Sequence, residues 1–252
     1  MSVRWVVHDT MPSSIEGWFQ ESGRAGRDGL GARCIICGPS VLVLTRHLTV
    51  HLSDFRPEDS YKVKKLLTEG TPPTKVTYLL RPLHQLTEIL LNPVLCRRRQ
   101  LLAHFSEVFP GENCHHCDNC VHGWETRWSL QDATIDALNA LELLSEMCKI
   151  KPYWTEHALA AAIRGERRYS SFTGNRVQAV SMLKGFGCQF AQACGKDATK
   201  GEIIKFLLVL IHKGIITEYK LQPSSSQNGN TYAQSHIYIK VCYKHSQMSF
   251  IL

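Results

Sequence analysis

Short runs of β-branched and other apolar residues predict strands near both ends of the chain. Residues 3–8 (VRWVVH) and 33–36 (RCII) have the length and composition of buried strands. Residues 215–219 and 236–241 have the same character. The polar segment 222–235, which contains an Asn-Gly pair, separates these last two strands and predicts a long hairpin loop.

Helical spacing of apolar residues predicts the elements in between. A short helix is expected over residues 15–20, and two or three helices are expected within residues 57–106. Gly and Pro interrupt helices, so a break is expected at residues 70–73 (GTPP). Three further helices are predicted. One covers residues 130–147, a second ends at residues 163–165, and a third covers residues 202–213 and is stopped by Gly214. Helices followed by a two-stranded wing are typical of an α+β winged-helix module.

The basic residues are concentrated in the C-terminal part of the chain. Residues 149–252 hold 14 lysines and arginines against 5 acidic residues, a net charge of +9, whereas residues 1–148 have a net charge of −2. This asymmetry favours a polyanion-binding domain at the C-terminal end, although a solubilising surface gives the same balance. Hydrophobic residues make up 44% of the chain, which is enough for packed cores.

A cluster of cysteines predicts a structural metal site. Cys114, Cys117 and Cys120 are separated by two residues each, a spacing that lets successive thiolates turn toward one centre. Tetrahedral zinc needs a fourth ligand, and Cys96, at the start of a predicted helix, is the leading choice. Four protein ligands leave no open position, so the expected role of the metal is structural.

Several alternatives to this zinc site remain open. His104, His115 and His116 compete with Cys96 as the fourth ligand, and an iron–sulfur cluster is the second choice of metal centre. No secretory signal is predicted, so the thiols are expected to be reduced and available to a metal. Free buried cysteines are disfavoured because the neighbouring residues are polar: Glu112, Asn113, Asp118 and Asn119.

Taken in order, these motifs resemble the RecQ family of DNA helicases. Residues 3–8 and the string at 20–29 (QESGRAGRDG) resemble the last motor motifs of that family. Cys96 and the two arginines after it, with the three later cysteines, resemble its zinc module. Residues 163–165 (IRG) and 195–197 (GKD) resemble its winged-helix domain.

The resemblance implies a three-part architecture. Residues 1–55 would be an α/β remnant of the second RecA-like helicase lobe. Residues 56–128 would be a helical four-cysteine zinc-binding module, and residues 129–252 a winged-helix DNA-binding domain of the RQC type. We expect the chain to be the C-terminal part of a longer helicase. The role of the apolar segment 38–54 and the contacts of residues 169–194 are not assigned.

The resemblance also implies roles for three residues near the N-terminus. Arg27 would be the arginine finger, Arg24 would assist it, and Gln20 would couple the nucleotide to DNA. A guanidinium against a γ-phosphate stabilises the charge that develops during hydrolysis. The alternative is a surface turn with solvated arginines. The sequence contains no G-x-x-x-x-G-K-[ST] motif, so we expect ATP and Mg²⁺ to bind only with a first motor lobe, and no ATPase activity from these residues alone.

In the C-terminal half, a basic run predicts phosphate contacts with DNA. Arg164, Lys196 and Lys200 are the expected contacts, the two lysines preceding a helix whose first amides also attract phosphate. Tyr232 lies near the expected hairpin tip, where its ring would stack on an unpaired base. The alternative is that Tyr232 packs against the wing.

Three functions are consistent with the sequence. The first is part of an ATP-dependent 3′–5′ DNA helicase for repair, recombination and replication, expected in the nucleus from the resemblance. It would act on duplex, forked and junction DNA, together with other repair and recombination proteins, and it would not bind a membrane. The second is a non-enzymatic, zinc-stabilised winged-helix DNA-binding protein. The third is a protein-interaction domain built on the zinc fold.

Overall fold

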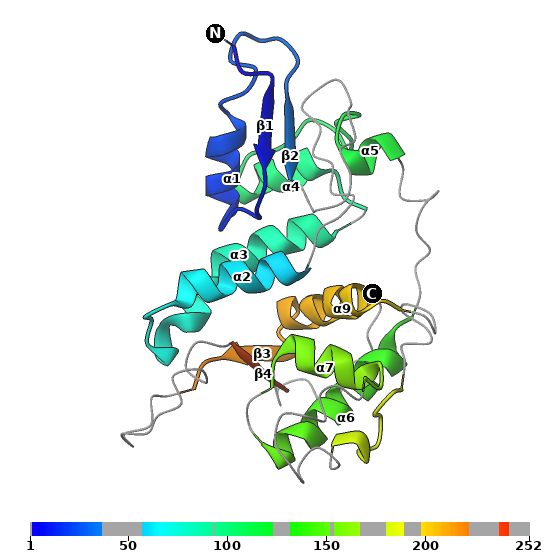
Figure 1. Ribbon diagram of the computed structural model, residues 1–252. Helices are drawn as coiled ribbons and strands as arrows, with labels where there is room; N and C mark the ends of the chain where they lie inside the picture. Colours follow the sequence, from blue (N-terminus) through cyan, green and yellow to red (C-terminus); the bar gives the residue numbers. More distant parts are fainter. Residues whose placement is uncertain are drawn as a thin grey trace. The chain divides into compact units, whose positions relative to one another are not determined.

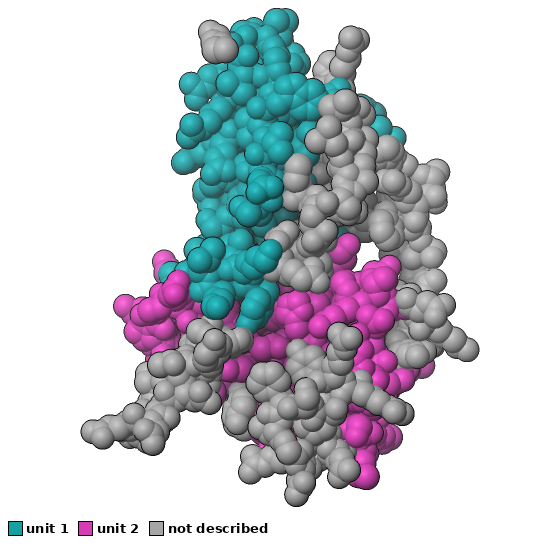
Figure 2. All heavy atoms as spheres, viewed as in Figure 1, with its two compact units in different colours: residues 1–67, 79–129 teal, residues 68–78, 130–252 magenta. Residues whose placement is uncertain are grey.

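A computed structural model describes residues 2–36, 57–92, 94–122, 132–151, 154–166, 180–188, 198–221 and 237–241. This part of the chain is mostly helical. It divides into two compact units, shown in Figure 2: residues 1–67 with 79–129, and residues 68–78 with 130–252. The predicted division at residues 55 and 128 stays a prediction. Within the described ranges, no helix is both long and apolar enough to cross a bilayer.

The described residues from 2 to 122 form a small sheet and a series of helices. The break predicted at residues 70–73 is confirmed, since one helix ends at Thr68 and Gly70 has a positive φ of 67°. Leu80, Leu83 and Leu86, which follow the helical period, are fully buried. The elements are β1 (Trp5–His8), α1 (Ile15–Ser22), β2 (Arg33–Ile36), α2 (Pro57–Thr68), a 3₁₀ turn (Pro73–Lys75), α3 (Val76–Leu91), α4 (Arg97–His104) and α5 (Asp118–His122) (Figure 1).

Helix α1 covers one face of the parallel pair β1–β2. The Ser14 hydroxyl caps the helix by accepting a hydrogen bond from the Gly17 amide, with an N–O distance of 3.0 Å. Trp18 on its buried side donates from Nε1 to the Cys34 sulfur of β2 at 3.4 Å. The other face of β1 carries Trp5, which is 42% exposed. Both strands and the helix predicted for this part are confirmed, but β1 is not the buried strand expected, because Trp5 and Val7 are exposed.

The main elements of the remaining described residues are three helices and an antiparallel strand pair. Helix α7 packs closely on its neighbours because its alanines are small, and Ala160 and Ala161 are fully buried. Trp154 extends the strand pair: its carbonyl accepts a hydrogen bond from the Ile239 amide at 2.8 Å. The elements are α6 (Thr134–Ile150), α7 (Glu156–Ile163), α9 (Lys200–His212), β3 (Ile216–Tyr219) and β4 (Tyr238–Val241).

The predicted starts of two helices were wrong, and the predicted ends of α1, α6 and α9 differ from the structure by one to three residues. Helix α6 was expected from residue 130, but it begins at Thr134, whose amide donates to the Asp132 carboxylate at 2.9 Å. Helix α9 was expected from Glu202, but it begins at Lys200. Thr199 and Glu202 form a capping box there, in which each side chain accepts a hydrogen bond from the other residue's backbone amide. The hairpin loop predicted over residues 222–235 lies outside the described residues.

Candidate metal centre and exposed arginine loop

Three short segments bring four cysteine sulfurs together. Cys96 is the N-cap of α4, Cys114 and Cys117 lie in the loop before α5, and Cys120 lies within α5. All four Sγ atoms lie within 4.8 Å of one another. The Cys117 and Cys120 sulfurs are 3.3 Å apart, and those of Cys114 and Cys120 are 3.9 Å apart. A tetrahedral zinc with bonds of about 2.3 Å places its sulfurs about 3.8 Å apart, so the donor set fits that ion.

The environment of these thiols suits a buried structural metal. Cys96, Cys114 and Cys117 are at most 9% exposed, and Phe109 packs against them. Burial raises the pKa of the Cys117 and Cys120 thiols. A bound divalent cation acts in the opposite direction, because it stabilises the thiolates. The Cys117 amide also donates to the Cys114 sulfur at 3.3 Å, which favours a negative sulfur.

The histidines considered as alternative ligands do not join this cluster. His104 lies 2.7 Å from the Glu16 carboxylate through its Nε2 atom, and His115 and His116 are exposed. Among the described residues, the group of mutually close ligand atoms consists of the four cysteines. The arrangement therefore favours Cys96 over histidine as the fourth ligand.

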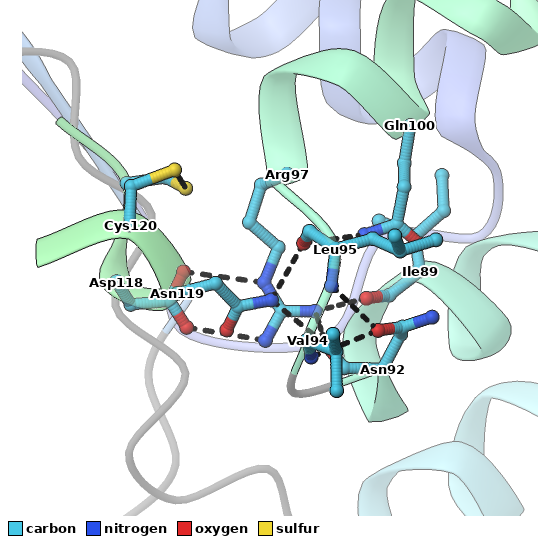
Figure 3. Close-up of polar contacts among 10 residues, drawn as sticks. Ile89, Asn92, Val94, Leu95, Arg97, Gln100, Asp118, Asn119 and Cys120 are labelled. Atoms are coloured by element: carbon cyan, nitrogen blue, oxygen red, sulfur yellow. Dashed lines mark hydrogen bonds and ion pairs between the residues drawn. The ribbon is translucent and has the colours of Figure 1, made fainter. Parts of the chain in front are cut away.

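A buried arginine next to the first ligand connects the cluster to α3 (Figure 3). The Arg97 guanidinium makes a two-pronged ion pair with the Asp118 carboxylate of α5, at 3.2 Å and 3.1 Å. Its third nitrogen donates to the Asn92 carbonyl at 2.7 Å and to the Ile89 carbonyl. Only 5% of the Arg97 side chain and 12% of the Asp118 side chain are exposed. Arg97 therefore satisfies open carbonyls at the end of α3 and fixes α5, the helix that carries Cys120.

A second side chain reinforces the same junction. The Asn119 amide donates to the Asn92 carbonyl at 2.9 Å and to the Leu95 carbonyl at 2.7 Å. Asp118 and Asn119, singled out in the sequence as polar neighbours of the cysteines, are both half-buried, and their polar groups hold the junction. The run Cys96–Arg99 contains three consecutive arginines, and only the helix phase decides which of them faces inward.

The string at residues 20–29 forms the end of α1 and an exposed turn. Gln20, Arg24 and Arg27 all have exposed side chains, and Arg27 Nε donates to the Gly23 carbonyl at 3.3 Å. Gly26 has a positive φ of 68°, and a Cβ there would lie 3.0 Å from the Leu30 carbonyl oxygen, so only glycine fits.

An ion pair fixes this turn to the residues just before β1. The Asp28 carboxylate accepts two hydrogen bonds from the Arg4 guanidinium, one of them at 2.8 Å. These bonds lower the pKa of Asp28 to about 2. The Gly26 amide also donates to the Val3 carbonyl at 3.0 Å, so the turn is held by both backbone and side-chain contacts.

Of the four predicted DNA contacts, two lie in the described residues. Arg164 caps the end of α7 and pairs with Glu166 at 3.1 Å, while remaining 40% exposed. Lys200 is the first residue of α9 and does not precede the helix as expected. Lys196 and Tyr232 lie outside the described residues.

The expected phosphate site at the start of α9 is already occupied by a carboxylate. Glu202 accepts hydrogen bonds from the Thr199 amide at 2.7 Å and from the Thr199 hydroxyl at 2.8 Å. These bonds lower the pKa of Glu202, which keeps it charged. The negative charge at this helix end disfavours a phosphate there.

Comparisons with known proteins agree with the metal-site geometry. The family model for RecQ zinc-binding matches residues 57–121, which include all four clustered cysteines. The RecQ-like DNA helicase blm-1 of Caenorhabditis elegans is 31% identical over 154 residues, 58% of this chain and 14% of that protein. The ATP-dependent DNA helicase hus2/rqh1 of Schizosaccharomyces pombe is 33% identical over 147 residues, 58% of this chain and 10% of that protein.

One relative aligns with nearly the whole chain. The ATP-dependent helicase SGS1 of Saccharomyces cerevisiae is 28% identical over 236 residues, 93% of this chain and 14% of that protein. The chain thus spans only 10–14% of the length of these three relatives.

Proposed function

We propose that this chain is the motor end and DNA-binding part of a RecQ-like 3′–5′ DNA helicase. The proposal rests on the match of its zinc-binding residues to the RecQ family and on the similarity of most of its length to a RecQ-like helicase. The observation that carries the proposal is the cluster of four cysteine sulfurs within the residues that match the RecQ zinc-binding family. In this proposal Cys96, Cys114, Cys117 and Cys120 hold one structural zinc ion. The site of action would be nuclear DNA during repair, recombination and replication.

The N-terminal residues support the motor part of the proposal. β1, α1 and β2 make a parallel β-α-β unit, the connection from which RecA-like lobes are built. The exposed Arg27 would stabilise the charge on a γ-phosphate, with Arg24 assisting and Gln20 relaying the nucleotide state to DNA. ATP and Mg²⁺ would be bound by a first lobe, so the 252 residues alone would hydrolyse no ATP.

The C-terminal residues support a winged-helix domain of the RQC type. Their order is α6, the strand position Trp154, α7, α9 and the antiparallel pair β3–β4. In this fold the helices form the body and the last two strands flank the wing. Arg164 and Lys200 would contact phosphates through their side chains and not through the start of α9, where Glu202 lies. Lys196 would act just before α9, and Tyr232 would stack at the wing tip.

DNA binding by the full chain tests this proposal. We expect tighter binding to forked or junction DNA than to blunt duplex, and an affinity that falls steeply with salt as counterions are released. Arg164→Ala and Lys200→Ala should each weaken binding to all sequences alike and reduce the salt slope by about one. Lys62→Ala, an exposed lysine of α2, is the matched control. Absence of DNA binding at low salt by zinc-loaded protein would contradict the proposal.

A non-enzymatic DNA-binding protein is the second candidate. It is favoured by the lack of a phosphate-binding G-x-x-x-x-G-K-[ST] motif in the sequence. The two candidates differ in the role of the exposed arginines, which act in ATP hydrolysis only in the first candidate. Adding a separate first RecQ lobe should restore DNA-stimulated ATP hydrolysis only if the first candidate holds, and Arg27→Ala should then abolish it.

A further inference from the structure

The helix that starts at a metal ligand ends against α1. Helix α4 is eight residues long, with Cys96 as its N-cap and His104 as its last residue. The His104 ring hydrogen-bonds the Glu16 carboxylate of α1 at 2.7 Å. The next residue, Phe105, packs its ring against Phe19 of α1, with 4.8 Å between the ring centroids. His104 and Phe105, at one end of α4, thus contact two α1 residues, Glu16 and Phe19, that lie one helical turn apart on the same side of α1.

Helix α1 leads directly into the exposed arginine turn. The Gly23 amide donates to the Phe19 carbonyl at 2.9 Å, and the Ala25 amide donates to the Ser22 carbonyl at 3.1 Å. The last residues of α1 therefore help to position the turn, together with its contacts to Val3 and Arg4. Phe19 belongs to both contacts, since its ring meets Phe105 and its carbonyl holds Gly23.

From these contacts we infer that His104 and Phe105 are positioning residues that transmit the order of the metal-bound module to the arginine turn at residues 23–27. The metal cluster fixes the start of α4, the helix carries that constraint over its eight residues, and its end holds α1 through Glu16 and Phe19. The consequence for catalysis rests on the proposed function, in which Arg24 and Arg27 face a nucleotide. The mechanical connection itself depends only on the contacts.

Native-state hydrogen exchange of the zinc-loaded full chain measures this connection. The amides of Gly23, Ala25 and Gly26 report on the turn, because each donates to a backbone carbonyl. His104→Leu removes the hydrogen bond to Glu16 and should speed exchange of these amides by about three- to tenfold, as expected for losing one polar contact. The amides of α9 are the internal reference and should not change.

Conservative and control variants separate positioning from general loss of stability. His104→Gln keeps a side-chain N–H donor at a similar reach, so it should restore the slow exchange at the turn. Glu16→Gln removes the charge from the α1 side and should resemble His104→Leu in weaker form. Glu107→Gln, an exposed carboxylate just beyond α4, is the matched control and should have no effect.

Zinc removal completes the test. Chelation should speed exchange at the turn in the wild type, and should add little at the turn once His104→Leu and Phe105→Ala have cut the connection. Unchanged exchange at Ala25 and Gly26 in both His104→Leu and Glu16→Gln, with zinc content intact, would overturn the inference. If His104→Leu loses zinc, Glu16→Gln decides alone. None of these readouts requires DNA or ATP, so failure of the proposed function would leave this result unaffected.

Discussion

The buried pair of Arg97 and Asp118 predicts a large and specific loss of stability in the zinc-binding residues. Arg97→Met keeps much of the side-chain volume but removes the donor to the Asp118 carboxylate and to the Ile89 carbonyl, while the Asn92 carbonyl keeps its hydrogen bond from Asn119. Removing one partner of a buried ion pair costs about 3–5 kcal/mol. Because 12% of the Asp118 side chain remains exposed, we expect the lower end, about 3 kcal/mol, or a factor of about 150 in the unfolding equilibrium.

Urea-induced release of zinc, followed with a colorimetric chelator at fixed free zinc, measures this loss. Metal binding contributes to stability by mass action, so the free zinc concentration must be the same for every variant. The matched control is Arg99→Met, an exposed arginine two residues along the same helix, whose effect should stay within about 0.5 kcal/mol. Combining Arg97→Met with Asp118→Leu should be less destabilising than the sum of the two single changes, because both charges then leave together. Equal effects of Arg97→Met and Arg99→Met, or strictly additive effects in the double variant, would refute the reasoning.

Three further outcomes follow from the structure. Elemental analysis should find one zinc per folded chain, and replacing one of the four ligand cysteines by serine should release the metal and unfold the surrounding residues in circular dichroism. Gly165→Ala should lower stability by about 2 kcal/mol in thermal unfolding, because its positive φ of 73° disfavours alanine and the new Cβ would lie 3.2 Å from Gly187 Cα. Gly29→Ala is the control, because Gly29 has a similar φ but open space around it, and this change should cost less. The Asp28 carboxyl should titrate near pH 2 in NMR, and Arg4→Gln should return its pKa toward 3.8. Since the folded pKa is lowered, this contact contributes above pH 3.8 and is lost as the pH falls toward 2.

The sequence predicted the elements whose signal is local. The spacing of Cys114, Cys117 and Cys120 predicted that these three thiols converge, because two intervening residues let successive thiolates turn toward one centre. The spacing left the fourth ligand open between Cys96 and nearby histidines, and the structure brings Cys96 to the other three. The parallel strands were identified as strands, but not their pairing, because pairing depends on contacts distant in sequence. The early start of α9 could have been predicted, because Thr199 followed by Glu202 three residues later is a capping-box pattern.

Burial of charged side chains could not be predicted in the same way. Arg97, Arg98 and Arg99 are identical residues at consecutive helical positions, about 100° apart around the axis, and the sequence does not give the phase of the helix. The partners that make Arg97 the buried one, Asp118 and the carbonyl of Asn92, come from other elements. The contact between His104 and Glu16 spans 88 positions and leaves no local signal.

Helix α4 connects two equilibria that are usually measured separately: metal binding at the four cysteines and ordering of the arginine turn at residues 23–27. Its first residue follows the ligand Cys96, and its last residue, His104, contacts α1. Thermodynamic linkage requires that such a connection act equally in both directions. If metal binding shifts the order–disorder equilibrium of the turn by a given factor, the metal binds the ordered turn more tightly than the disordered turn by that factor. A ligand that orders the turn therefore tightens metal binding by up to that factor. The zinc affinity of this chain would thereby report on the occupancy of a site built around Arg24 and Arg27, without a measurement of catalysis.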